Sequence, residues 1–474
     1  MQYKDVVDRL RIRPILLCAF LVAIVVATYY AGVVHGDFQY DDSFAILINP
    51  HLNQWDTFIG HLDHMVRPVL YATFFIDRSL YGERATGYHV LNLLLHLGSG
   101  ILLYRILMRA VTENNRYVPF WTSLLFLIHP IQTETVTYIS GRASGLMAFF
   151  FLLALFLYIK RSESLDDRRI SQLYFFGALT SFFLSLASKE TAVVFPLALL
   201  LWDTLVRRLR GASLQVTCVS QHLPFWLMLS VVGLVVWNHP RYTALAQFSF
   251  GIRPLWENLL SELHAAAYAL LLFFCPGKQN FDHDLPLFHS LVQWPLPLDL
   301  LLIGGLAGGA LLLVRRLPLF SFGIGWFLLL LLPTSLIPRN DLLSERNLYL
   351  ASIGILLAAA VLGSGLTHRL AKILQKPVLV RVAIGSIVLM VVLGFSLMTL
   401  QRNELYRDPV LLWSDAVEKS PQKARPHNNL GHAYALRDDW NRAIEEYRNA
   451  ARLNPDYAPA QQNLRDAYLR QVGR

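Results

Sequence analysis

Charged side chains are scarce in this chain: Asp, Glu, Lys and Arg together make up only 16% of its 474 residues. A soluble domain carries about 25% charged residues, so the shortage excludes an ordinary water-soluble protein of this size. The charges that are present fall in short clusters, and long apolar runs fill the intervals between them. Because 54% of the residues are hydrophobic, the composition predicts a chain that lipid solvates along most of its length.

Cysteine and nucleotide-binding motifs are also lacking. The three cysteines, Cys18, Cys218 and Cys275, are far apart in or beside apolar segments, which excludes a disulfide framework and zinc-ligand spacing. There is no P-loop, no GxGxxG motif and no nucleophile elbow, so a site for ATP or a nucleotide sugar is not supported. The net charge of +9 comes from Lys and Arg at the ends of apolar runs. These form no single basic stripe, which argues against nucleic acid as a partner.

Apolar segments long enough to cross a bilayer are abundant. A helix needs about 20 apolar residues to span the hydrocarbon while it satisfies its own backbone hydrogen bonds. About eleven segments meet this requirement, the first as a signal anchor: 14–34, 88–108, 118–138, 143–159, 171–187, 191–206, 221–237, 297–314, 319–337, 347–366 and 381–400. The sequence therefore predicts an all-α, polytopic transmembrane helical bundle over residues 1–401.

The distribution of Lys and Arg predicts the orientation of these segments. With a cytoplasmic N-terminus, every cytoplasmic segment carries Lys or Arg, whereas the outer loops, although longer in total, hold about half as many. Segment 256–276 is also apolar enough to span, but spanning would move Arg315 and Arg316 to the outside. We therefore expect a re-entrant or interfacial helix there, which places the C-terminal tail on the extracytoplasmic side.

The tail, residues 402–474, has a soluble composition and repeats itself at a spacing of 34 residues. The recurring positions are Trp413 and Tyr447, Ala416 and Ala450, Pro421 and Pro455, and Tyr434 and Tyr468. This spacing is typical of tetratricopeptide repeats (TPR), in which small residues permit close helix crossing and aromatic residues fill the gap. Fewer than three repeats are usually unstable alone, so we expect this α-hairpin domain to pack against the last span or the outer loops. It would act either as a groove for a protein partner or acceptor, or as a structural cap.

The first outer loop, residues 35–87, is rich in polar and aromatic residues. Asp41 and Asp42 follow the first span closely and have aromatic neighbours. A carboxylate that is partly desolvated there has a raised pKa and can accept a proton from a hydroxyl nucleophile. The alternative is a pair of solvated acids that cap a short helix. Arg67 precedes an amphipathic segment, 68–81, which we expect to lie in the membrane interface as a lid.

Further polar groups lie at the outer ends of the predicted spans. They are His129, Glu134, Arg142, Lys189, Glu190, Lys278, Glu345, Arg346 and Tyr349. Charged groups near a bilayer edge are costly unless they are paired or functional, so each is either part of a structural ion pair or part of a site. Arg346 stands at the mouth of a span, where its fork of donors suits a lipid phosphate. The His61, Asp63 and His64 run has no established metal-ligand spacing, so we predict no metal site.

Several stretches of the chain occur in the order that they have in a known family. They are FQYDDSFAILINP (38–50), GYHVLNLLLH (87–96), LLFLIHPIQTETVTYISGRASGL (124–146), SKETAVVFPLALLLWD (188–203) and ERNLYLASIG (345–354), followed by the repeats of the tail. Together they resemble the membrane O-mannosyltransferases that carry luminal TPR arrays, and their prokaryotic relatives, within the glycosyltransferase-C superfamily. The tail here is much shorter than the arrays of the animal members.

The resemblance implies a membrane glycosyltransferase. Such an enzyme transfers a sugar, with mannose expected, from a polyprenyl- or dolichyl-phosphate carrier to a hydroxyl of a polypeptide or glycan, without a cofactor, although a divalent metal stays open. The acidic pair matches the general base of the family, with Asp41 favoured as the base and Asp42 as its orienter or the alternative. Arg346, Tyr349 and Lys278 correspond to the donor phosphate site. The other candidate site residues are Arg67, His129, Glu134, Arg142, Lys189, Glu190 and Glu345.

Two other functional classes compete with this interpretation. A non-enzymatic membrane anchor that presents the TPR tail to protein partners would not need so elaborate a first loop. A transporter would place ionisable groups near the bilayer midplane, whereas the candidates here lie at the ends of spans. The short loops and few cysteines favour a bacterial inner membrane as the location.

Overall fold

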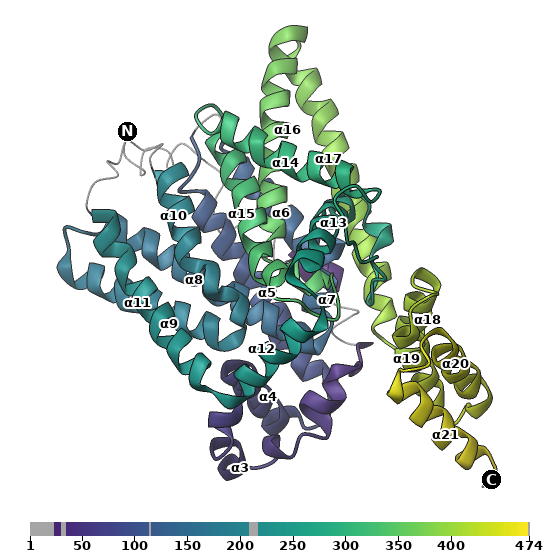
Figure 1. The fold of residues 1–474 in the computed structure, drawn as a ribbon. Helices are drawn as coiled ribbons and strands as arrows, with labels where there is room; N and C mark the ends of the chain where they lie inside the picture. Colours follow the sequence, from purple (N-terminus) through teal and green to yellow (C-terminus); the bar gives the residue numbers. More distant parts are fainter. Residues whose placement is uncertain (1–22, 30–34, 113–114, 208–216, 473–474) are drawn as a thin grey trace.

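The computed structural model describes residues 23–29, 35–112, 115–207 and 217–472, and all regular structure in these ranges is helical (Figure 1). The long helices form one bundle. They are α5 (Ala85–Leu107), α6 (Val118–Ile128), α8 (Arg142–Glu163), α9 (Arg168–Ser188), α10 (Phe195–Leu205), α11 (Thr217–Asn238), α14 (Leu296–Leu313), α15 (Pro318–Leu336), α16 (Ser352–Leu374) and α17 (Pro377–Leu405).

Eight of the described helices are long and apolar enough to cross a membrane: α5, the helix over Ile139–Glu163, α9, α11, α14, α15, α16 and α17. Helices in lipid associate through close packing rather than through exclusion from water. Helices α15 and α16 show this, because a Cβ atom on Gly354 would lie 2.2 Å from the carbonyl oxygen of Gly323. The predicted all-α, multi-pass membrane bundle is confirmed.

Three predicted spans take a different form. The segment 14–34 lies mostly outside the described residues. The segment 118–138 is divided into α6, a 3-10 turn (Pro130–Gln132) and the short helix α7 (Thr133–Val136). The 11 residues of α6 reach about 16 Å, half the hydrocarbon thickness. Helix α6 ends because His129 precedes Pro130 and adopts an extended backbone, as residues before proline do. The segment 191–206 is likewise divided, into a 3-10 turn and the short helix α10.

The predicted re-entrant segment is helix α13 (Leu255–Phe274). Just before it, Arg253 donates to the carbonyl oxygen of Arg339. Shortly after it, a ring nitrogen of His283 lies 3.0 Å from the carboxylate of Glu345. Both flanks of α13 therefore reach the same connection between α15 and α16. The re-entrant path itself stays a prediction.

The first loop folds into a layer across the end of the bundle where this connection lies. It contains α3 (Trp55–Ile59) and α4 (Pro68–Tyr81), and α4 has the bounds predicted for the amphipathic segment. Phe58 of α3 and Phe74 of α4 are buried, whereas Trp55 of α3 is 61% exposed. Helix α12 (Pro240–Ile252) lies beside this layer and buries none of its own residues. These exposed apolar groups suit the interface of a membrane.

The tail consists of four helices packed as consecutive hairpins: α18 (Pro409–Lys419), α19 (Ala424–Ala435), α20 (Trp440–Leu453) and α21 (Ala458–Val472) (Figure 1). Gly431 allows α19 and α20 to approach, since a Cβ atom there would lie 2.8 Å from the ring of Tyr447. The assignment of these hairpins to the TPR class and the domain boundary at 401 stay predictions. Helix α17 continues to Leu405 before the tail begins.

Candidate functional site

The two acids of the first loop occupy different environments. Asp42 is fully buried, and one of its carboxylate oxygens accepts hydrogen bonds from the Ser140 backbone N–H (2.8 Å) and hydroxyl group. The other oxygen accepts from the backbone N–H of Gln39 at 2.9 Å. Burial raises the pKa of Asp42 to about 7, although these hydrogen bonds oppose the rise. Asp42 therefore ties the loop to the turn that precedes α8 and offers no free oxygen.

Asp41 is the open member of the pair. Its side chain is 45% exposed, and a carboxylate oxygen lies 3.7 Å from a terminal nitrogen of the Arg346 guanidinium. Its backbone N–H donates to the phenolic oxygen of Tyr138 at 3.1 Å, which fixes the residue relative to the bundle. A hydroxyl group of another molecule can approach the Asp41 carboxylate, and it cannot approach that of Asp42.

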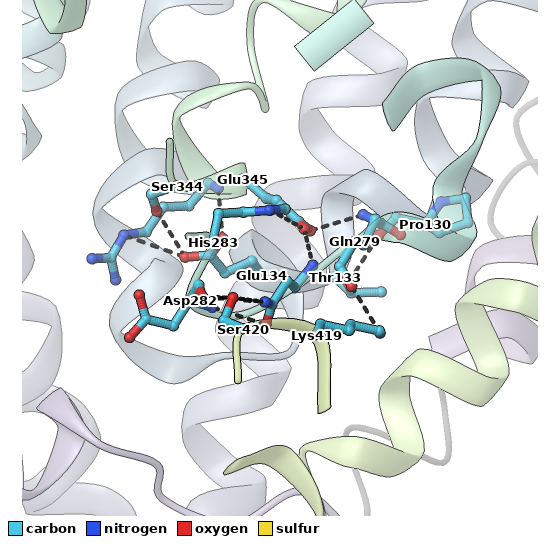
Figure 2. Close-up of polar contacts among 12 residues, drawn as sticks. Pro130, Thr133, Glu134, Gln279, Asp282, His283, Ser344, Glu345, Lys419 and Ser420 are labelled. Atoms are coloured by element: carbon cyan, nitrogen blue, oxygen red, sulfur yellow. Dashed lines mark hydrogen bonds and ion pairs between the residues drawn. The ribbon is translucent and has the colours of Figure 1, made fainter. Parts of the chain in front are cut away.

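Arg346 is held by a buried acid. The Glu134 carboxylate accepts from the backbone N–H of Arg346 at 3.0 Å and from the Ser344 hydroxyl at 2.9 Å (Figure 2). The guanidinium lies 3.6 Å from Glu134 and over the ring of Tyr138 at 5.7 Å. Burial disfavours its charged form, yet Glu134, Tyr138 and Asp41 together raise the pKa of Arg346 above its usual value. Arg346 is thus a fixed cation with its exposed edge toward Asp41.

Two further cations lie near Arg346. Arg67 forms a two-pronged ion pair with Glu190, at 3.1 and 2.7 Å, which joins the first loop to the connection after α9. Burial opposes ionisation of Glu190, but Arg67 lowers the pKa of its carboxyl to about 2. The Lys189 amine donates to Ser144 and Asn347, each at 2.7 Å. Burial, together with the charges of Arg67 and Arg346, lowers the pKa of Lys189. An anion in this region would relieve the mutual repulsion of the three cations.

Other residues predicted for the site lie apart from the Asp41 carboxylate and have partners of their own. His129 donates to the carbonyl oxygen of Phe273 and accepts from a backbone N–H. Glu345 is fully buried and receives hydrogen bonds from Gln279 and His283 (Figure 2). It also receives hydrogen bonds from the Asn280 backbone N–H and from Arg402. These contacts hold the segment after α13 to the end of α17.

Arg142, Tyr349 and Lys278 also stand away from the open acid. Arg142 is fully buried and forms an ion pair of 2.6 Å with Asp77 of α4. Tyr349 is 1% exposed, and its hydroxyl contacts His96 at 2.8 Å. Lys278 is exposed, whereas the ion pairs of Arg346 among the described residues are with Asp41 and Glu134. The structure therefore brings Asp41, Arg346, Glu134, Lys189, Glu190 and Arg67 into one region.

Sequence reasoning missed several neutral groups of the same region. Tyr138, Ser140, Ser344 and Asn347 all lie within or beside the stretches that contain the predicted charged residues. Only their position in those stretches could have identified them, because Tyr, Ser and Asn are all common at a membrane surface. Among the described residues, no group of three or more His, Cys, Asp or Glu side chains is arranged to hold a metal ion.

No family model matches the chain. It is 25% identical to the protein O-mannosyl-transferase F38B6.6 of Caenorhabditis elegans over 90% of this chain and 61% of that protein. It is 25% identical to human protein O-mannosyl-transferase TMTC3 over 94% of this chain and 52% of that protein. The mouse protein O-mannosyl-transferase TMTC4 is 28% identical over 88% of this chain and 64% of that protein. These similarities confirm the resemblance seen in the sequence.

The chain spans between half and two thirds of the length of these curated relatives. Among solved structures, ArnT from Cupriavidus metallidurans bound to undecaprenyl phosphate superposes with a TM-score of 0.43 and 13% identity. The superposition covers 86% of this chain and 80% of that chain. A likeness of this degree carries no argument about the site.

Proposed function

We propose that this protein is a membrane glycosyltransferase that transfers a sugar, mannose by our expectation, from a polyprenyl-phosphate carrier to a hydroxyl acceptor. A Ser or Thr hydroxyl of a polypeptide is the acceptor we favour. The observation that carries the proposal is the open carboxylate of Asp41 beside the fixed cation of Arg346. The similarity to proteins named O-mannosyl-transferases supports the choice of reaction.

The mechanism that suits this arrangement is a single displacement with inversion. Asp41 takes the proton from the acceptor hydroxyl while the oxygen of that hydroxyl bonds to C1 of the sugar. The bond between C1 and the carrier phosphate breaks, and the phosphate leaves with the electron pair. Arg346, with Lys189 and Arg67 nearby, would stabilise the negative charge that develops there. Asp42 would act as the orienter, since its hydrogen bonds to Ser140 hold the loop in place.

The direct test is an assay of the purified protein with a panel of polyprenyl-phosphate sugars and a Ser- and Thr-containing peptide. Transfer from one of these donors, with inversion at C1, is the expected result. Transfer from none of them, in protein shown to be folded and inserted, would contradict the proposed activity.

We expect Arg346→Ala to raise the KM for the polyprenyl-phosphate donor about 10- to 100-fold. The reason is that a hydrogen bond to a charged group contributes about 1.5–3 kcal/mol, and 1.4 kcal/mol corresponds to a factor of ten. Steady-state rates at varied donor concentration would measure the change. Arg346→Lys should recover part of the affinity, since Lys keeps the charge and loses the fork.

The matched control is Arg407→Ala. Arg407 is also an exposed arginine at this end of the bundle, where it pairs with Glu404 at 2.7 Å. Its removal should leave the donor KM unchanged. An unchanged KM in Arg346→Ala would show that Arg346 does not bind the donor phosphate.

We also propose that the tail and the Asp41 loop face the extracytoplasmic side, with the N-terminus in the cytoplasm of a bacterial cell. The positive-inside rule supports this orientation. A phosphatase reporter fused after Arg474 should therefore be active, and the same reporter fused after Arg316, beyond α14, should be inactive. The reverse pair of results would show that α13 spans the membrane, which would place Arg316 outside and the tail in the cytoplasm. Equal results would contradict the three spans α15, α16 and α17 that separate the two fusion points.

A further inference from the structure

Tyr40, the residue before Asp41, has an unusual backbone conformation. Its φ angle is +40°, in the left-handed region that non-glycine residues seldom adopt. Such a conformation costs free energy and persists only where surrounding contacts impose it. Locally, the Asp42 backbone N–H donates to the carbonyl oxygen of Gln39 at 2.8 Å and closes the turn. A distant part of the chain adds to this, because the ring of Tyr40 packs edge-on against Trp413 of α18 with the ring centroids 5.3 Å apart.

Trp413 belongs to an aromatic cluster that joins the tail to the candidate site. Its members are Tyr40, Tyr138, Phe281, Tyr406 and Trp413. Phe281 is the central ring and lies between 5.3 and 6.4 Å from the centroids of the other four. Tyr138 completes the connection, since it accepts from the Asp41 N–H and lies under the Arg346 guanidinium. The cluster therefore contacts the supports of both groups.

Polar contacts fix the tail at this cluster. The Ser420 hydroxyl accepts from the side-chain amide of Asn280 (2.7 Å) and donates to the carbonyl oxygen of Asp282 (2.8 Å). Lys419 donates to the carbonyl oxygen of Gln279 at 2.8 Å. Figure 2 shows Lys419 and Ser420 beside the segment that contains Gln279, Asp282 and His283, whose side chains include two that contact Glu345. The start of the tail is thus bound to the segment after α13 by side-chain hydrogen bonds.

The entry of the first loop is tied to the same place. The carbonyl oxygen of Tyr406, just after α17, accepts from the Asp37 backbone N–H at 3.2 Å and from the Gln39 side chain at 3.1 Å. Residues on both sides of Tyr40 are therefore fixed, by Tyr406 on one side and by Tyr138 on the other. The ring of Tyr40 packs against Trp413, the nearer ring, and against Phe281.

We propose that Trp413 is a positioning residue of the glycosyltransferase site: through the ring of Tyr40 it holds the left-handed turn that presents the Asp41 carboxylate. The tail is on this view a part of the site and not only a cap or a docking module. This inference rests on the proposed function, in which Asp41 is the base. It assigns to α18 a role in catalysis that does not require contact with the substrate.

The test compares Trp413→Ala with Trp440→Ala in the full-length protein. Trp440 is the matched control because it is a tryptophan of the same tail that packs in the second hairpin, against Arg470. We expect Trp413→Ala to lower kcat on the order of 100-fold, as a misplaced catalytic group does, with the donor KM unchanged. Trp440→Ala should keep both constants. Trp413→Phe, which restores a ring against Tyr40, should recover most of kcat.

Hydrogen exchange gives a readout that needs no sugar transfer. Peptides that cover residues 37–44 should exchange faster in Trp413→Ala than in the wild type and in Trp440→Ala. Tyr40→Ala removes the same contact without altering the tail, so it should reproduce the loss of kcat. The double variant with Trp413→Ala should then lose no more than either single variant, because the two residues act as one unit.

The outcomes separate this inference from the proposed function. An inactive wild type would contradict the function, and the exchange rates would still decide whether Trp413 holds the loop. An active wild type with equal kcat in Trp413→Ala and Trp440→Ala would overturn the positioning role. So would a loss in Trp413→Ala that Tyr40→Ala does not reproduce.

Discussion

Asp41→Asn is expected to reduce sugar transfer by about 10²- to 10⁴-fold, the range that a general base contributes. The amide has the shape of the carboxylate but cannot accept the proton of the acceptor hydroxyl. The side chain is 45% exposed, and its loss of charge leaves Arg346 with its Glu134 partner, so folding and donor binding should persist. Initial rates with the purified protein, and binding of the donor measured separately, would check both parts.

Asp37→Asn is the matched control for this experiment. Asp37 lies in the same loop, and its carboxylate accepts only a local hydrogen bond from the Phe38 N–H. Transfer in this variant should equal that of the wild type. Asp42→Asn is a poor control, because both carboxylate oxygens of Asp42 face N–H or O–H donors that an amide nitrogen cannot satisfy. Full activity in Asp41→Asn would exclude Asp41 as the base.

Arg142→Met is expected to destabilise the attachment of α4 to the bundle by about 3–5 kcal/mol, the cost of leaving a buried charge without its partner. The guanidinium binds Asp77 at 2.6 Å and also donates to Asn92, Thr73 and the carbonyl oxygen of Tyr88. Methionine fills most of the volume and supplies none of these contacts. Hydrogen exchange of the peptides over 68–81 would measure the local opening free energy.

A double variant tests whether the charge imbalance is the cause. Arg142→Met with Asp77→Leu removes both members of the pair, and replacing a buried ion pair by apolar groups is often nearly neutral. Exchange over α4 should then return toward the wild-type rate. If the double variant is as unstable as the single one, the hydrogen bonds to Asn92 and Tyr88 matter more than the ion pair.

The parts of the fold that follow from local pattern were predictable from the sequence. Helix α4 has the predicted bounds, because Arg67-Pro68 marks its start and the amphipathic period continues to Tyr81. The long spans follow from length and apolarity. The end of α6 was not predicted, since Pro130 interrupts an apolar run without changing its composition. A hydropathy window averages over a single proline, whereas that proline ends the helix at the residue before it.

The candidate site was predictable in kind and not in arrangement. The charges at the ends of spans were visible, but only the family resemblance favoured Asp41 over Asp42, and the sequence did not separate site charges from structural ones. Asp42 is buried and hydrogen-bonded to Ser140, which leaves Asp41 as the accessible acid of the pair. The ion pair between Arg142 and Asp77 identifies Arg142 as a structural charge, and the spacing of these two residues in the sequence does not predict their contact. Such pairings depend on how distant segments pack, which one sequence does not display.

The contact between the first loop and the end of α17 has a consequence for the biosynthesis of the protein. Gln39 and Tyr406 are joined by a hydrogen bond although 367 positions separate them. The ribosome makes the loop first and the tail last, so the loop waits through nearly the whole of translation without its support. A chain that stalls or is cut before α18 therefore inserts a nearly complete bundle that lacks the ring of Trp413 against Tyr40. On the proposed positioning role, sugar transfer by such a truncated chain would fall on the order of 100-fold, as expected for Trp413→Ala.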